Sequence, residues 1–243
     1  MDSNRQSFPS GNPFPVITAS NISPSVRVAA FLSAVYGWMC AGLAITAATA
    51  WYVAGSPAIL SAIVSNRALF WALMIAQLGI VFALSARVQK MAPTTAALLF
   101  IFYAALTGVT LSFLLLMYTG ESVATTFLVT AGAFGGLALY GTVTERNLTG
   151  FGQFLFMGLI GLMLASVVGI FWQSDGLQFI ISVIGVIVFT GLTAYDAQRL
   201  KALALTAPEG PLSTYAVVGA LTLYLDFVNL FLFLLRFTGS RRR

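Results

Sequence analysis

The sequence predicts an all-α membrane protein that folds as a bundle of seven transmembrane helices. Of its 243 residues, 59% are hydrophobic and only 8% are charged, whereas a soluble domain carries about 25% charged residues. In lipid the backbone must satisfy its own hydrogen bonds, so only helices and closed barrels span a bilayer. The apolar segments run for about 20 residues or more without alternating with polar residues, which favours helices.

The predicted spans lie at residues 28–53, 68–85, 94–118, 123–142, 151–172, 177–200 and 213–237. The first span is closed by Gly55, Ser56 and Pro57, because glycine and proline interrupt regular structure. The second span ends at Arg87 and Lys90, whose charges belong at the membrane surface.

The later spans end at polar residues in the same way. The third stops before Gly120 and Glu121, the fourth before Glu145 and Arg146, and the fifth before Asp175. The connections are short, so we expect neighbouring helices to be antiparallel and to form one compact bundle.

The polar ends of the chain flank a single domain. Residues 1–26 are polar and rich in proline, which is typical of a disordered tail. Residues 27–240 form one seven-helix transmembrane domain, and residues 241–243 form a basic tail. The formal net charge of +5 is interpreted as topology and lipid-headgroup anchoring, so nucleic acid is not an expected partner.

The distribution of basic residues predicts a cytoplasmic N-terminus. The side that holds the N-terminus would carry Arg5, Arg27, Arg87, Lys90, Arg146, Arg199 and Lys201. The arginines at 241–243 disagree, because seven full crossings would place them on the other side. A seventh segment that does not fully cross the membrane would remove this conflict.

The composition excludes several kinds of site. The chain has no histidine and a single cysteine, Cys40, which excludes histidine metal sites, serine–histidine triads, imidazole pH sensing and an intramolecular disulfide. A proton switch within the membrane must therefore use carboxyl groups. Small residues in the fourth and fifth spans are expected to allow close helix approach. They are Gly132, Gly135, Gly136, Gly158 and Gly161.

Two aspartates lie inside predicted spans. Asp196 occurs in FTGLTAYDAQRLK and Asp226 in ALTLYLDFVNLFLFLLR. A charged side chain at the centre of a bilayer costs about 2.5–3.5 kcal/mol on insertion scales, so such a residue indicates a functional site.

The spacing of the two aspartates predicts that they lie at similar depth. Their midpoint is Pro211, inside the strong turn signal of residues 207–211. In an antiparallel hairpin, residues equally far from the turn lie at equal depth. This prediction requires the sixth helix to continue past Lys201 to Leu205.

The expected chemistry is that of a carboxyl pair. Two adjacent carboxylates in a medium of low dielectric constant do not both ionise cheaply, so they share a proton and titrate as a unit. A shared proton closes the pair, and its loss produces repulsion or an oxygen-rich site for a hard cation such as Ca²⁺. Asn229, Tyr195 and Tyr224 are candidates to supply further polar groups to an ion path or around the pair.

Each aspartate also has a purely structural interpretation. Asp196 could pair with Arg199 three residues later, at an interfacial helix end. Asp226 has no basic residue within one helical turn. Its structural alternative is burial with a partner from another helix.

At these residues the chain resembles the transmembrane Bax inhibitor motif family, in particular its bacterial members. The segments that carry the resemblance are IVFALSARVQKM, FTGLTAYDAQRLK and GALTLYLDFVNLFLFLLRFTG, and the layout extends it over about residues 25–240. The resemblance implies a bundle whose last helix is enclosed by the other six. It also implies a pH-sensitive Ca²⁺ leak that is gated by an aspartate pair, which corresponds to Asp196 and Asp226 here.

The resemblance also assigns roles on the second span. Arg87 in LSARVQKM is similar to the family's charged partner of the pair, with a topology-setting helix end as the alternative. Many relatives carry a glutamate about ten residues earlier, where this chain has Gln77. Glutamine offers a carbonyl oxygen as a ligand but lacks the negative charge of glutamate. Gln77 is therefore a candidate residue of the ion path, with a lower affinity for cations than glutamate would have.

The favoured function is a pH-sensitive Ca²⁺ or cation leak of a bacterial inner membrane, without enzymatic activity or cofactor, whose partners are lipid, Ca²⁺ and protons. One alternative is a regulatory protein that acts on membrane proteases or on stress and death pathways through residues 1–26. Another is an intramembrane aspartyl protease, which Tyr195-Asp196 fits. The segment Leu223-Tyr224-Leu225-Asp226 lacks the Gly-x-Gly-Asp of that family, however, and no Pro-Ala-Leu follows.

Overall fold

A computed structural model describes residues 23–87, 90–172, 174–206 and 212–242. Its helices are α1 (Pro24–Ala54), α2 (Pro57–Ser65), α3 (Arg67–Arg87), α4 (Pro93–Met117), α5 (Gly120–Val143), α6 (Thr149–Phe171), α7 (Asp175–Thr206) and α8 (Leu212–Thr238). All except α2 are long and apolar enough to cross a membrane. Among the described residues no strand occurs beyond one isolated β-bridge. The predicted seven-span, all-α architecture is confirmed.

Prolines begin several of these helices. Pro24, Pro57 and Pro93 each occupy the first turn, where the missing N–H has no helical partner to lose and the fixed φ suits the helix. The short helix α2 was not predicted, because Gly55 and Pro57 indicate a turn. Helix α1 includes residues 24–26, which were expected in the tail. The rest of the expected tail, residues 1–22, lies outside the described residues.

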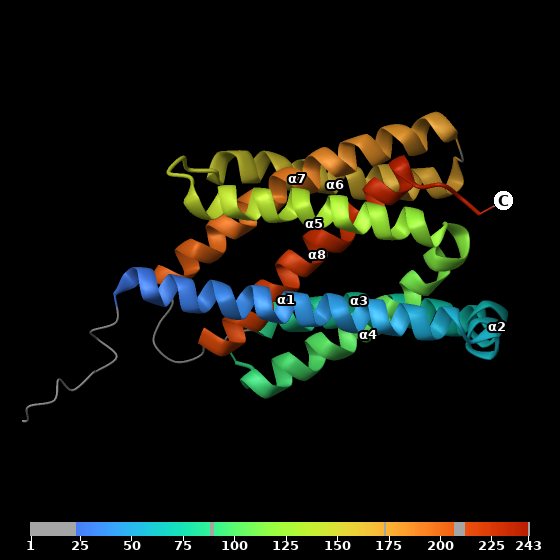
Figure 1. The fold of residues 1–243 in the computed structure, drawn as a ribbon, viewed down its shortest axis with the longest axis horizontal. Helices are drawn as coiled ribbons and strands as arrows, with labels where there is room; N and C mark the ends of the chain where they lie inside the picture. The colour runs from blue at the N-terminus through green and yellow to red at the C-terminus, as the bar shows by residue number, and fades with distance from the viewer. Residues whose placement is uncertain (1–22, 88–89, 173, 207–211, 243) are drawn as a thin grey trace, which may run out of the picture.

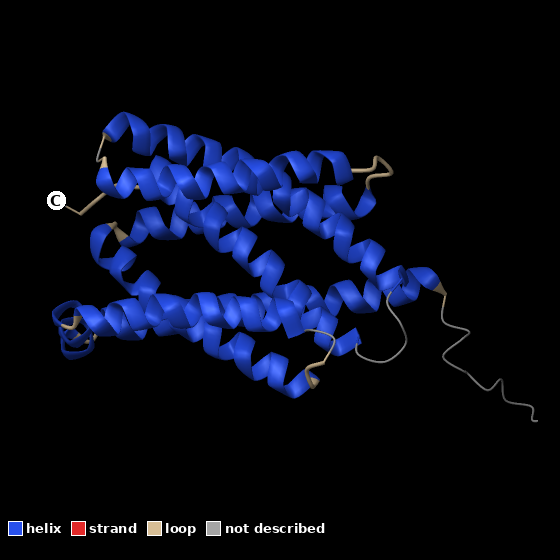
Figure 2. Ribbon diagram, turned by 180° about the vertical axis from the view of Figure 1, so that it is seen from behind, coloured by secondary structure: helices blue, strands red, loops and turns tan. Residues whose placement is uncertain are grey.

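The helices form two groups with α8 between them (Figures 1 and 2). Helix α4 packs on α1 and α3 in one group, and α7 packs on α5 and α6 in the other. Helix α8 contacts α1, α4, α5 and α7, and so bridges the two groups.

Helix α8 is the most buried span. In its most apolar stretch 61% of the residues are buried, compared with at most 44% in any other span. Its enclosure by all six other spans stays a prediction, because the extensive packing shown is with four of them.

Helix α7 continues to Thr206, which confirms the predicted extension past Lys201. Helix α8 begins at Leu212 and packs against α7 as its neighbour. The predicted turn at residues 207–211, with Pro211, lies outside the described residues.

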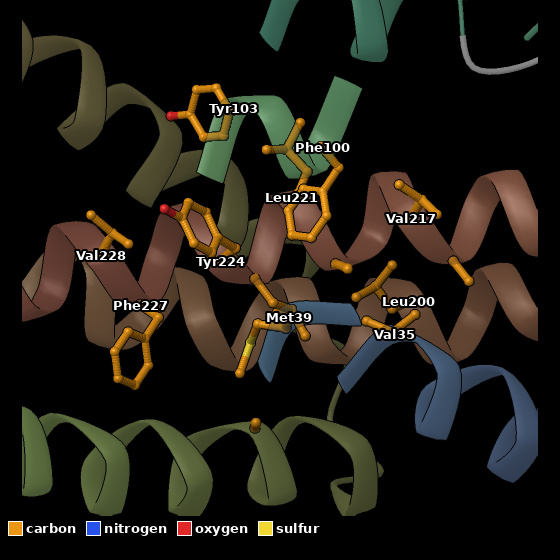
Figure 3. Close-up of a cluster of buried hydrophobic side chains, with 14 of the residues drawn as sticks. Val35, Met39, Phe100, Tyr103, Leu200, Val217, Leu221, Tyr224, Phe227 and Val228 are labelled. Carbon is orange, nitrogen blue, oxygen red and sulfur yellow. The ribbon is translucent and has the colours of Figure 1, made fainter. Parts of the chain in front are cut away.

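The main core surrounds Tyr224 of α8 (Figure 3). The Tyr224 ring meets Phe100 and Tyr103 of α4 edge-on, with ring centroids 5.7 and 5.9 Å apart. Val35 and Met39 of α1 belong to the same buried cluster. These contacts fix how α8 is rotated, and so which of its faces turns toward α7.

Close helix approaches occur at other glycines than those predicted. A Cβ at Gly132, Gly135, Gly136 or Gly161 would meet no atom within 4 Å, and at Gly158 only Val188 Cγ2 at 3.3 Å. That prediction is therefore wrong for the first four and weak for Gly158. A Cβ at Gly141 would instead collide with the carbonyl oxygen of Ala194 where α5 crosses α7.

The chain end docks at the opposite end of the bundle from the start of α1 (Figure 1). Thr119 N donates to Ser240 O at 3.1 Å, and Arg242 N donates to Met117 O at 2.9 Å. Helix α8 has 27 residues, about 40 Å at 1.5 Å per residue, and so is long enough for a full crossing. The suggestion that the seventh span stops short is therefore not supported.

Candidate functional site

The two aspartates meet between α7 and α8. Asp196 is only 8% exposed and Asp226 only 5%. Their carboxyl side chains lie within hydrogen-bonding reach of each other, as the spacing about residue 211 predicts. The two helices come close because Gly219 of α8 faces Leu200 of α7: a Cβ at Gly219 would lie 2.6 Å from Leu200 Cδ2.

One oxygen of the pair has no donor. Asp226 Oδ2 is fully buried and accepts no hydrogen bond from any described residue. A buried acceptor left without a donor is costly, and ionised carboxylates only accept. A proton held between the two carboxyl groups would supply the donor that the described residues lack here.

Arg199 is the basic residue whose charge acts on the aspartate pair. Its positive charge acts on Asp196 from the next turn of α7, while its own side chain is exposed. Among the described residues the two form no ion pair or hydrogen bond, so the simple helix-end pairing predicted as the structural alternative is not formed.

Arg87 lies elsewhere. It is exposed in the last turn of α3, and within the described parts of the chain it makes no hydrogen bond or ion pair to Asp196 or Asp226. In this conformation the charged partner implied by the family resemblance does not contact the pair, and its role stays a prediction.

A cavity of about 560 Å³ leads to the pair from the end of the bundle where α1 begins. Asp196 lines it, whereas Asp226 does not. The lining residues are Ser85, Asp196, Arg199, Leu200, Ala202, Leu203, Thr206, Tyr215, Val218, Gly219 and Thr222. Sequence reasoning missed Ser85 and Thr222. The position of Thr222 four residues before Asp226, on the same face of α8, was an available signal.

The two candidate tyrosines face away from the pair. The Tyr224 hydroxyl is 2.7 Å from Thr46 Oγ1, on the side of α1 and α4. Tyr195 packs its ring on α6, against the position of Gly152. Both rings therefore serve helix packing in this conformation.

The two candidate amides donate hydrogen bonds to helices, Asn229 within its own helix and Gln77 to a neighbouring one. Asn229 Nδ2 donates to the carbonyl of Leu225 at 2.8 Å, in its own helix. Gln77 Nε2 donates to Leu106 O at 3.0 Å and to Thr110 Oγ1 at 3.3 Å, which ties α3 to α4. Gln77 thus has a structural role, whereas its place in an ion path stays a prediction.

The residues that follow Asp196 anchor its helix. Gln198 accepts from Leu148 N at 2.9 Å and donates to Arg146 O at 2.8 Å. Lys201 Nζ donates to Thr142 O at 2.6 Å, at the C-terminal end of α5, where a cation is favoured by the helix dipole. The segment YDAQRLK therefore combines a buried carboxyl with two residues that fix α7 against the α5–α6 connection.

The pair could contribute only part of a Ca²⁺ site. Two carboxylates offer at most four oxygens, whereas Ca²⁺ takes 6–8. Among the described residues there is no group of three or more His, Cys, Asp or Glu side chains placed to hold a metal. A cation here would keep water or backbone ligands, as a passing ion does.

Comparisons with known proteins agree with the sequence motifs. Residues 28–243 match the family model described as inhibitor of apoptosis-promoting Bax1. The chain is 49% identical over 226 residues to inner membrane protein YbhL of Escherichia coli K12, covering 92% of this chain and 97% of that protein. It is 45% identical over 214 residues to an uncharacterized protein of Borreliella burgdorferi, covering 87% and 92%. It is 41% identical over 236 residues to one of Caulobacter vibrioides, covering 92% and 93%.

Proposed function

The chain belongs to the Bax inhibitor family, and from this premise we propose that it is a pH-sensitive Ca²⁺ leak channel gated by the pair Asp196–Asp226. With seven candidate spans and strong similarity to an inner membrane protein, it is a multi-pass protein of a bacterial inner membrane. The proposal concerns what crosses that membrane and what controls the crossing.

The observation that carries the proposal is the buried carboxyl pair at the inner end of a cavity. Asp196 lines the cavity of about 560 Å³, whereas its partner Asp226 is buried and does not line it. Beyond Asp226, large apolar side chains of α8 such as Phe227 and Leu230 are buried in the bundle. A path across the membrane is closed at this level until α7 and α8 separate.

Proton loss supplies the force for such a separation. With one shared proton, the two carboxyl groups attract each other and hold α8 against α7. Without it, two unit charges about 4 Å apart repel by about 4 kcal/mol at an effective dielectric constant of about 20. That energy changes an equilibrium constant by about 10³-fold, which is enough to switch a closed state to an open one.

The same geometry favours a gate over the alternatives. A protease would need substrate and water at both carboxyl groups, whereas Asp226 Oδ2 is fully buried. A regulator that acts only through residues 1–26 would need no paired carboxyls inside the bundle, where each costs energy.

Ca²⁺ entry into liposomes that contain the purified full chain tests the proposal. Since proton loss opens the gate, flux is expected to be higher at neutral than at acidic pH. Asp226→Asn is expected to abolish this pH dependence and to keep flux low, because the amide stays neutral and can donate to Asp196. The measurement is the ratio of initial rates, followed with a Ca²⁺ dye inside the liposomes.

The matched control is Glu121→Gln, the same carboxylate-to-amide change at an exposed residue in the first turn of α5. It should leave the ratio of rates unchanged. The proposal fails if the wild-type flux does not respond to pH, or if Asp226→Asn and Glu121→Gln behave alike.

A further inference from the structure

The basic residues at the chain end line a second cavity, far from the aspartate pair. Arg236 in the last turn of α8 and Arg241 in the tail border a space of about 830 Å³, together with Asp175 and Gln178 of α7. We propose that this cavity binds a phosphate group, presented by the headgroup of an anionic phospholipid in the leaflet on that side.

The C-terminal residues 239–242 are hydrogen-bonded to the bundle next to this cavity. Ser240 N donates to Ser122 Oγ at 3.0 Å, and its carbonyl accepts from Thr119 N at 3.1 Å. Tyr118 and Arg241 form an antiparallel β-bridge. Gly239 is required for this docking, because a Cβ there would lie 2.7 Å from the Tyr118 ring. The backbone of Arg241 is therefore held at the cavity.

The two guanidinium groups are available for an anion. Arg236 lies over the Phe233 ring, 5.8 Å from its centroid. Within the described residues neither Arg236 nor Arg241 forms an ion pair or a side-chain hydrogen bond, even though Asp175 borders the same cavity. Two positive charges face one negative charge, so the cavity keeps a net charge of +1.

The chemistry of these groups suits phosphate. A guanidinium group is a planar fork of donors that matches the spacing of phosphate oxygens and binds them in pairs. The cavity also borders the first turn of α7, which begins at Asp175. The free N–H groups of a helix start add partial positive charge.

The position at the membrane edge indicates a lipid as the source of the phosphate. Arg236 and Asp175 lie at the ends of two spans, where lipid phosphates lie. Phe179 and Phe237 each follow a lining residue in the sequence; their rings are paired at 5.4 Å between centroids and are 58% and 49% exposed. Aromatic rings at this depth contact the region just below the headgroups. A bound phosphate also gives a reason for the arginines on the side where topology rules disfavour them.

Native mass spectrometry of the full chain in detergent tests this site. The probes are phosphatidylglycerol, phosphatidylcholine and inorganic phosphate. We expect phosphatidylglycerol to be retained in preference to phosphatidylcholine. Arg236→Gln and Arg241→Gln should each reduce its retention about tenfold, the effect of losing one charge-assisted contact. Arg236→Lys, which keeps the charge without the fork, should lie between wild type and Arg236→Gln.

The matched control is Arg242→Gln, which removes the same charge from the neighbouring exposed residue that does not line the cavity. It should change retention less than twofold. Equal losses of phosphatidylglycerol retention in Arg241→Gln and Arg242→Gln would overturn the proposal. They would indicate only non-specific electrostatic attraction between the basic residues and the lipid. Binding of inorganic phosphate that depends on Arg236 and Arg241, without lipid retention, would overturn the lipid source. Thermal unfolding of each variant separates loss of binding from loss of fold.

Discussion

Neighbouring residues of α8 have opposite roles because they face different helices. Tyr224 is fully buried and its hydroxyl is satisfied by Thr46 Oγ1 at 2.7 Å. Asp226, two positions later, faces α7 and keeps one oxygen without a donor. A polar group whose bonds are complete stabilises the fold, whereas an incomplete one is available for function.

Tyr224→Phe tests this distinction. The change should lower stability by about 0.5–1.5 kcal/mol, the net value of one hydrogen bond. Thr46 can still donate its one hydroxyl hydrogen to the carbonyl of Gly42 or of Ala104, each 2.9 Å from Thr46 Oγ1. The pH dependence of Ca²⁺ flux should be unchanged. Thermal unfolding in detergent measures the first effect. Tyr195→Phe is the control, since no described residue hydrogen-bonds to the Tyr195 hydroxyl. An equal effect of both changes would contradict the argument.

At the scale of helices, the crossing of α5 and α7 holds the pair in place. Gly141 of α5 lies directly against the backbone of Ala194, two residues before Asp196. The hydrogen bonds of Gln198 and Lys201 fasten the next turns of α7 to the end of α5 and its connection. The position of Asp196 thus depends on how closely these two helices approach.

Two glycine substitutions in α5 should have opposite effects on stability. Gly141→Ala forces the two helices apart and should cost about 1–3 kcal/mol, as overpacking does. The Cβ added by Gly132→Ala would meet no atom within 4 Å. This change should be neutral or stabilising by up to about 1 kcal/mol, since alanine favours the helix. Thermal unfolding of both variants measures the difference. Destabilisation by Gly132→Ala to the same extent would show that helix α5 packs differently.

At the scale of the whole molecule, seven crossings place the two ends of the described chain on opposite faces. Helix α1 begins at one end of the bundle, and the tail is hydrogen-bonded to the α4–α5 connection at the other. The excess of basic residues in the internal loops predicts that the face with the start of α1 is cytoplasmic. The cavity that leads to Asp196 would then open to the cytoplasm, and the proposed phosphate site would face outward.

Cysteine labelling tests this orientation. In a Cys40→Ser background, Ser240→Cys should react with a membrane-impermeant maleimide in intact cells. Ser25→Cys, exposed at the start of α1, should react only after the membrane is permeabilised. The unlabelled background protein is the control. Labelling of Ser25→Cys alone in intact cells would reverse the orientation, and equal labelling of both would contradict an odd number of crossings.

The sequence by itself determined the seven spans and the similar depth of Asp196 and Asp226. Span length depends on local hydropathy, and the depth of the two aspartates depends on equal spacing from one turn, so neither requires knowledge of distant neighbours. Only the tertiary structure decided that Gly141 and not Gly132 lies at a crossing, that Tyr224 faces Thr46 and not the aspartate pair, and that the tail docks beside Tyr118. These outcomes depend on how each helix is rotated and which segments lie side by side. Uniformly apolar helices carry little sequence signal for either, because lipid and protein neighbours are almost equally apolar.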